Sequence, residues 1–330
     1  WFRNTWWRDP DEPRPVLRAA EGNGAGGGAT VRAEHPELGA YLLACEADAP
    51  LLFCENETNT ERLWGQPNAT PYPKDAVHEA VVHGRADAVH PDRTGTKVAA
   101  HHEAEVPAGG SWTIRLRLAA TLPAEPFGAA FDDVLTTRIA EADEFYEALT
   151  PPRVSDDAAA VMRQALGSLL WSKQHYYYDV DRWLTDRGIH PLRHDVGPEQ
   201  PNARWFHMYN RDVVAMPDTW EYPWYAAWDL AFHAIGLGMV DLAFARDQLR
   251  LLLSDRYLHP NGQIPAYEWN FSDVNPPVHA LASFFCFAEG RKITGENAHD
   301  FLEDMFLKLL LTFTWWVNRK DPTGANAFEG

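Results

Sequence analysis

The chain has 330 residues, 45% of them hydrophobic and 23% charged, which is the balance of a globular protein with a sizeable core. Its net charge of −18 argues against binding to nucleic acid or to an anionic membrane surface, because both require basic patches. Cys45, Cys54 and Cys286 make neither a disulfide framework nor a CxxC zinc motif, so a reducing, cytoplasmic environment is expected. The apolar run from Phe306 to Val317 is shorter than a membrane span and predicts a core helix.

The first third of the chain predicts an antiparallel β region. From Ala29 to Leu118 the hydrophobic period is mostly two, with turn residues between the runs, which is typical of a β-sandwich. The strand candidates are Tyr41–Cys45, Leu51–Cys54, Ala80–His83 and Ser111–Leu118. The Gly-rich segment Gly22–Gly28 lacks a phosphate-loop pattern, and His101-His102-Glu103 lacks the HExxH spacing of a metal site. We interpret them as a surface loop and a polar strand.

From Phe127 onwards the hydrophobic period becomes helical. An apolar stripe continues to Leu149 before Pro151-Pro152 breaks it, so this helix is expected to link a β domain to an α domain. Ser155 is a predicted N-cap, and the helix that follows is expected to continue into Trp171–Tyr178. Further helices are predicted through Asp229 to Gly238, after Asp241, at Val278–Lys292, and from Phe301 to Val317.

These patterns predict a mixed fold of three segments. Residues 1–125 are expected to form part of an antiparallel β-sandwich, 126–152 a helical linker, and 153–330 part of an α/α toroid. About five helices in the last segment are joined by loops of unequal kind, which favours a toroid over a plain bundle.

The stretch from Pro217 to Pro277 concentrates Trp, Tyr, carboxylate and amide side chains in two loops that flank two helical patterns. Aromatic rings offer flat apolar faces to a pyranose, while carboxylates and amides hold its hydroxyls. A carboxylic acid among apolar rings tends to have a raised pKa, which a general acid needs. The stretch therefore predicts a sugar site with Asp229 as its first candidate. The 14 tryptophans fit a large aromatic core as well as a carbohydrate site.

Trp228-Asp229 stands at a predicted helix start, and Gly-Gln-Ile-Pro-Ala-Tyr-Glu-Trp at 262–269 and Ser-Asp-Val-Asn-Pro-Pro at 272–277 follow it. On these residues the stretch resembles glycoside hydrolase family 63, particularly relatives of mannosyl-oligosaccharide glucosidase and of the mannosylglycerate hydrolases. The resemblance extends over essentially the whole chain through Trp1–Trp6, Glu55–Arg62, Leu170–Gln174 and Trp315–Asp321.

The resemblance implies a β-sandwich followed by an (α/α)6 barrel, which hydrolyses α-glycosidic bonds with inversion and without a cofactor or metal. One carboxylic acid protonates the leaving oxygen, and a second carboxylate, roughly 6.5–9.5 Å away, activates water. The family's acid falls on Asp229. Its base is a Glu a couple of hundred residues later, beyond Gly330. We therefore expect an internal fragment of a larger enzyme, inactive by itself and missing the remainder of its chain as a partner.

Several other side chains in the stretch are candidates for substrate binding. They are Trp224, Trp228, Asn261, Gln263, Glu268, Trp269, Asn270, Asp273 and Asn275. The tryptophans are explained equally well as core residues. Glu268 could bind hydroxyls, make a structural hydrogen bond or be a second carboxylate. His233, one turn after Asp229, is more simply explained as a core histidine with its hydrogen bonds satisfied.

Two other functions are compatible with this pattern. One is a non-catalytic carbohydrate-binding protein on the same toroid, and the other is a related sugar phosphorylase. The expected partner is an oligosaccharide or small glycoside, and glucosides, mannosylglycerate and glucosylglycerate all remain open.

Overall fold

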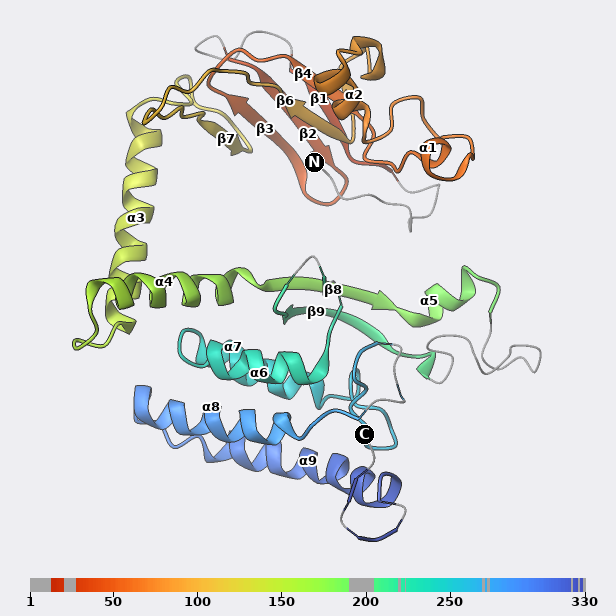
Figure 1. Ribbon diagram of the computed structural model, residues 1–330, viewed down its shortest axis with the longest axis vertical. Coiled ribbons are helices and arrows are strands. Elements are labelled where there is room, and N and C mark those ends of the chain that lie inside the picture. Colours follow the sequence, from red (N-terminus) through yellow and green to blue (C-terminus); the bar gives the residue numbers. More distant parts are fainter. Residues whose placement is uncertain are drawn as a thin grey trace. The chain divides into compact units, whose positions relative to one another are not determined.

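The computed structural model describes residues 13–20, 28–189, 205–218, 221–222, 224–268, 271, 274–321, 323–325 and 327–328 (Figure 1). The chain divides into two compact units, Trp1–Ala142 and Asp143–Gly330. The division falls inside helix α3 (Ala129–Leu149), and the role of residues 126–152 as a linker stays a prediction. Among the described helices, none combines the length and the apolar character that a membrane span requires.

The first unit is built on two antiparallel sheets. The larger has the strand order β5-β1-β2-β3-β7, and the smaller pairs β4 with β6. Their bounds are Val16–Ala19 (β1), Thr30–His35 (β2), Gly39–Cys45 (β3), Leu51–Cys54 (β4), Thr94–Gly95 (β5), Lys97–Ala100 (β6) and Leu116–Ala119 (β7). Leu17 and Val31 of the larger sheet pack against Phe53 of the smaller one. The two sheets therefore enclose a common core, which confirms the predicted β-sandwich.

Two strand predictions in this unit are wrong in detail. Residues 80–83 belong to helix α2 (Ala76–His83), which ends at Gly84 in the left-handed conformation. A four-residue apolar run is too short to distinguish a period of two from one of 3.6. The strand expected over 111–118 is limited to β7, and residues 101–103 form no strand. The remaining short helices are α1 (Thr60–Trp64) and the 3-10 turn η1 (Ala86–Ala88).

The second unit is mainly helical. Its elements are α4 (Asp156–Trp171), β8 (Lys173–Asp179), α5 (Val180–Thr185), β9 (Tyr209–Ala215), α6 (Ala227–Leu237), α7 (Leu242–Leu252), α8 (Val278–Thr294) and α9 (His299–Arg319). Ser155 caps α4 because its side chain accepts a hydrogen bond from the Ala158 amide. Asp241 caps α7 because its side chain accepts one from the Phe244 amide. Gly295, in the left-handed conformation, ends α8. These predicted helix boundaries are confirmed.

The long helix expected to reach Tyr178 stops at Trp171, and after Ser172 the seven residues Lys173–Asp179 form strand β8. β8 pairs antiparallel with β9, from Lys173 opposite Ala215 to Asp179 opposite Tyr209. Tyr176 is buried while its neighbour Tyr177 is exposed, as the pleat of a strand requires. The aromatic run thus follows its β propensity rather than the helical stripe before it.

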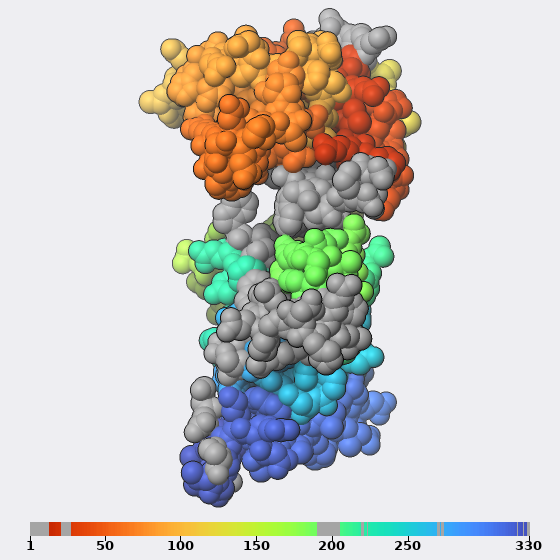
Figure 2. All heavy atoms as spheres, turned by 90° about the vertical axis from the view of Figure 1, so that its right-hand side faces the viewer, coloured from red at the N-terminus to blue at the C-terminus, as the bar shows by residue number. Residues whose placement is uncertain are grey.

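Helix α6 lies at the centre of the second unit and packs against α4, α7, α8 and β9 (Figure 1). Leu230, Ala231, Ala234 and Leu237 of α6 are fully buried, and the two alanines allow close approach of the neighbouring helices. Successive helices laid side by side in this way form part of a helical barrel, as predicted. Figure 2 shows the face on which α5, in green, and the segment after α7, in light blue, reach the surface.

Candidate active site

The two segments of the sugar-site prediction meet at the first turn of α6. Ala226, the residue before the helix, is extended and pairs with Tyr267 in an antiparallel bridge. The Ala227 amide donates a hydrogen bond of 2.9 Å to the carbonyl oxygen of Ala266. The loop that carries Glu268 is therefore fastened directly to the helix start that carries Asp229.

A close contact holds the other end of this loop against α9. Gly262 has a φ of +91°, and a Cβ atom there would lie 2.6 Å from the carbonyl oxygen of Leu311. Only glycine combines that φ with that approach. The turn at Gly262 thus brings the loop onto the last helix of the unit.

Asp229 is the third residue of α6 and is half-buried. Burial raises the pKa of its carboxyl group, while a hydrogen bond from its own backbone amide and the charge of His233 oppose that rise. Burial lowers the pKa of His233, and its Nδ1 atom is buried without a hydrogen-bond partner among the described residues. His233 therefore does not match the satisfied core histidine that the sequence favoured.

Glu268 is only 7% exposed and lies beside the buried Tyr176 and Tyr225. The Tyr176 hydroxyl, from β8, donates a hydrogen bond to its carboxylate. Tyr225 packs edge-on against Tyr176 and Tyr257, with ring centroids 5.8 and 5.0 Å apart. Burial raises the pKa of Glu268 to about 7, partly offset by the bond from Tyr176. The carboxyl group is thus held in an apolar aromatic setting that favours its protonated form.

Three predicted hydroxyl ligands brace the loop itself. Asn261 Oδ1 accepts a hydrogen bond of 2.8 Å from the Gln263 amide. The side-chain nitrogen of Gln263 donates to the Phe271 carbonyl at 3.0 Å, and that of Asn275 donates to the Ile264 carbonyl at 2.7 Å. These bonds fix the loop, and their direct role toward substrate stays a prediction.

The tryptophan candidates divide by exposure. Trp228 is 43% exposed and meets Phe232 edge-on at 6.0 Å, whereas Trp224 is partly buried against Tyr222. Trp228 can therefore offer a ring face to a ligand. Three further predicted residues lie outside the described part of the chain: Trp269, Asn270 and Asp273.

A pocket of about 370 Å³ opens beside Trp228, and we call it the aromatic pocket. It is enclosed by the starts of α6 and α8, the loop before α8 and the second half of α9. Its aromatic and apolar lining residues are Ala227, Trp228, Ile264, Pro276, Pro277, Ala280, Leu309, Phe313, Trp315, Trp316 and Phe328. Its polar lining residues are Asn275, His279 and Thr312. The α9 residues were not predicted as site residues, because their helical spacing indicated a core helix.

The side chain of His279 connects helix α8 to helix α7 beside the aromatic pocket. It is buried, and its Nε2 atom lies 2.8 Å from the Leu249 carbonyl oxygen of α7. Burial lowers its pKa to about 4, so the neutral ring donates this bond at neutral pH. Because protonation favours the unfolded chain, the stability that the neutral ring contributes is present above the unfolded pKa of 6.5 and is lost as pH falls toward 4.

We expect His279→Gln to reduce this acid sensitivity, because the glutamine amide keeps a donor near the Leu249 carbonyl but does not titrate. Between about pH 7 and about pH 5, the wild type should lose about 2 kcal/mol more unfolding free energy than the variant. Urea denaturation followed by tryptophan fluorescence at the two pH values measures the difference. Equal pH dependence of the two proteins would contradict the buried, neutral assignment.

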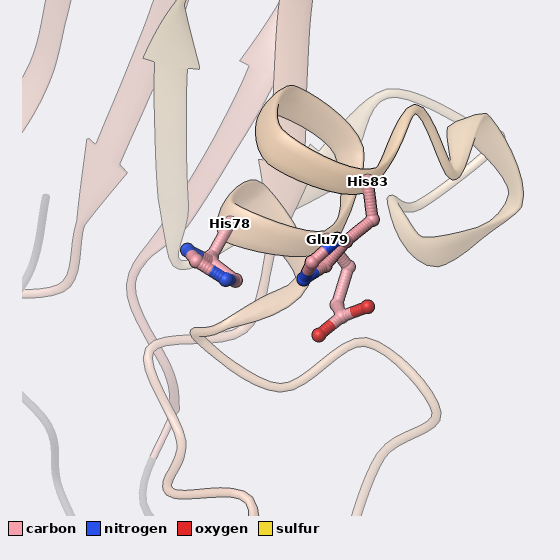
Figure 3. A group of neighbouring side chains, drawn as sticks. All are labelled: His78, Glu79 and His83. Atoms are coloured by element: carbon pink, nitrogen blue, oxygen red, sulfur yellow. The ribbon is translucent and has the colours of Figure 1, made fainter.

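The first unit contains a separate group of metal-ligand side chains on α2. Donor atoms of His78, Glu79 and His83 lie within 4.8 Å of one another, and the three side chains extend toward a common region (Figure 3). Both histidines are exposed, and the Glu79 carboxylate already pairs with the guanidinium groups of Arg62 and Arg85, each at 3.6 Å. Since two cations neutralise this carboxylate, we assign no metal to the group.

Comparison with known proteins bears directly on the second unit. Residues 222–329 match the family model described as mannosylglycerate hydrolase MGH1-like glycoside hydrolase domain. This range contains Asp229, Glu268 and every residue of the aromatic pocket. The match supports a glycosidase-like family for this segment.

A longer protein is similar to most of the chain. Uncharacterized protein YMR196W of Saccharomyces cerevisiae is 44% identical over 297 residues, which cover 86% of this chain and 27% of that protein. The chain therefore spans about a quarter of the length of this relative.

Proposed function

We propose that the second unit provides the catalytic acid of an inverting α-glycoside hydrolase of the family 63 type, with an α-glucosidase-like action on oligosaccharides or glycosyl-glycerates. The observation that carries the proposal is a half-buried Asp229 on the first turn of α6, inside the segment that matches a glycoside hydrolase domain. Its raised pKa favours the protonated form that a general acid requires.

In this mechanism Asp229 donates its proton to the glycosidic oxygen as the bond to the anomeric carbon breaks. A second carboxylate removes a proton from the water that attacks the opposite face of the ring. We assign that base to a residue outside these 330 residues, as the family resemblance implies. Glu268 is assigned a supporting role, because it is buried and bonded to Tyr176.

Two observations support a longer functional protein. The similar yeast protein is nearly four times as long as the matched part of this chain. Helices α8 and α9 also carry exposed apolar side chains outside the aromatic pocket, including Phe284, Phe285, Phe306 and Leu307. Such side chains are usually covered by further structure. We propose that the remaining helices of the barrel cover them, and that the protein is cytoplasmic.

The proposal is tested by a screen of α-linked disaccharides, mannosylglycerate and glucosylglycerate, using the full-length protein that carries this sequence. Hydrolysis of at least one α-linked compound is expected, and the 330-residue chain alone should release no sugar at a comparable rate. Sugar binding without hydrolysis by the full-length protein would instead identify a carbohydrate-binding protein. Cleavage that depends on inorganic phosphate would identify a phosphorylase.

A further inference from the structure

The segment 261–268 is held to the rest of the second unit by one contact that involves a carboxyl group. Its other end-point near α6 is a backbone bond of 2.9 Å from the Ala227 amide to the Ala266 carbonyl, which does not titrate. The remaining contact is the hydrogen bond that the Tyr176 hydroxyl of β8 donates to the Glu268 carboxylate. Attachment of the segment to β8 therefore depends on a group that can ionise.

The opposite end of the segment contains one titratable contact of another kind. The Nδ1 atom of His259 accepts a hydrogen bond of 3.2 Å from the Asn261 amide. Protonation of that ring would break the bond as pH falls, whereas ionisation of Glu268 occurs as pH rises. On the side of α9, the close approach at Gly262 is to the backbone and side chain of Leu311 and Trp315, neither of which titrates. The two ends thus respond to pH in opposite directions.

The surroundings of Glu268 provide no cation within the part of the chain that the structure describes. β8 contributes Tyr176, and the segment before α6 contributes Tyr225, whose hydroxyl is buried without a hydrogen-bond partner among the described residues. The nearby carboxylate of β9, Asp212, pairs instead with Arg256 at 2.9 Å. A carboxylate removed from water without a cation is strongly unfavourable, so the neutral acid is the form that fits the closed segment.

We propose that Glu268 and Tyr176 form a pH-sensitive latch, which holds residues 261–268 against the start of α6 while Glu268 is protonated and releases them when its carboxyl group ionises. Burial raises the pKa of Glu268 to about 7, which places the release near neutral pH. The latch itself does not depend on the proposed glycosidase function. Only its consequence for sugar binding does, because Asn261 and Gln263 lie on the released segment.

Hydrogen exchange of the full-length protein, followed by mass spectrometry, measures the release without any sugar. The Ala227 amide reports the closed state, because its bond to Ala266 breaks when the segment leaves α6. Its protection is corrected for the intrinsic pH dependence of exchange. In the wild type it should then fall about tenfold between about pH 6 and about pH 8.5, given pKa values for Glu268 of about 7 when closed and 4.5 when exposed.

Two substitutions should change this pH response in different ways. Glu268→Gln cannot ionise, so the protection of the Ala227 amide should be the same at both pH values. Tyr176→Phe removes a hydrogen bond that lowers the pKa of Glu268, so the loss of protection should move to higher pH. Tyr177→Phe is the matched control from the exposed face of the same strand, and it should follow the wild type.

An amide in the middle of α7, such as that of Leu249, should stay more strongly protected than the Ala227 amide at every pH, because the segment opens without unfolding the unit. Protection that is independent of pH in the wild type, or that falls equally in Glu268→Gln, would overturn the latch. Equal protection of the two amides would also overturn it, since the segment would then open only with the whole unit. None of these outcomes bears on the glycosidase proposal, which is decided by hydrolysis in the substrate screen.

Discussion

Replacing Asp229 by Asn should reduce hydrolysis by the full-length protein by roughly 10²–10⁴-fold, the usual contribution of a general acid. Asparagine has nearly the same shape and keeps the polar contact at the start of α6, but it carries no proton to give to the leaving oxygen. Sugar affinity should therefore change little. Hydrolysis rates and binding of a methyl α-glycoside, measured on the same preparations, distinguish loss of the catalytic step from loss of sugar binding.

Asp255→Asn is the matched control, because Asp255 is an exposed carboxylate after α7 in the same unit. Its hydrolysis rate should equal that of the wild type. The pH dependence gives a second check on Asp229. An acid must be protonated, so the wild-type rate should fall as pH rises through the raised pKa of Asp229. If Asp229→Asn retains wild-type hydrolysis, the acid has been assigned to the wrong residue.

Replacing Glu268 by Gln should stabilise the second unit at neutral pH and change how its stability depends on pH. The pKa of Glu268 is about 7 in the folded protein and 4.5 in the reference state. The folded protein therefore binds the proton more tightly, and stability falls as pH rises from about 4.5 to about 7. Glutamine removes this loss of stability and keeps an oxygen that can accept the Tyr176 hydrogen bond.

Between about pH 5 and about pH 7, the contribution of Glu268 to the unfolding free energy should fall by about 2 kcal/mol. Glu268 and His279 act in opposite directions over this interval, so their contributions nearly cancel in the wild type. On acidification from neutral pH, Glu268→Gln should lose stability more steeply than the wild type, and His279→Gln should gain it. Urea denaturation of the three proteins at both pH values provides the comparison. Parallel curves would show that neither side chain titrates as its burial implies.

The sequence predicted the elements whose signals are local. Ser155, Asp241 and Gly295 each mark a helix end by a short-range hydrogen bond or a backbone conformation, and each is found in that role. The β-sandwich also followed from short apolar runs such as Tyr41–Cys45, separated by turn residues. These signals depend on a few neighbouring residues, so they can be read without knowledge of the tertiary structure.

The β8–β9 hairpin could not be predicted in the same way. The residues from Lys173 come soon after a helical stripe, and their strand form depends on pairing with residues 30 to 42 positions later. The role of Tyr176 at Glu268 depends on that same pairing, because the two residues are 92 positions apart. The available signal was the run Tyr176-Tyr177-Tyr178, because aromatic residues are enriched in strands.

The composition of the candidate site was predicted more fully than the geometry of its side chains. Asp229 and Glu268 were proposed from their aromatic surroundings and from the family resemblance, and the Ala226–Tyr267 bridge holds their segments together. The α9 side chains that line the aromatic pocket were not predicted, because residues within an apolar helical stripe carry no local sign of a pocket. Only the packing of α9 beside the starts of α6 and α8 places them there.

The stereochemistry of the released sugar tests the central claim most directly. The full-length protein is incubated with its α-linked substrate in an NMR tube, and the anomeric proton of the product is followed before mutarotation equilibrates it. An inverting α-glycosidase that uses Asp229 as acid predicts that the β-anomer appears first, and that Asp229→Asn releases neither anomer at an appreciable rate. Initial release of the α-anomer, or unchanged release by the variant, would contradict the account.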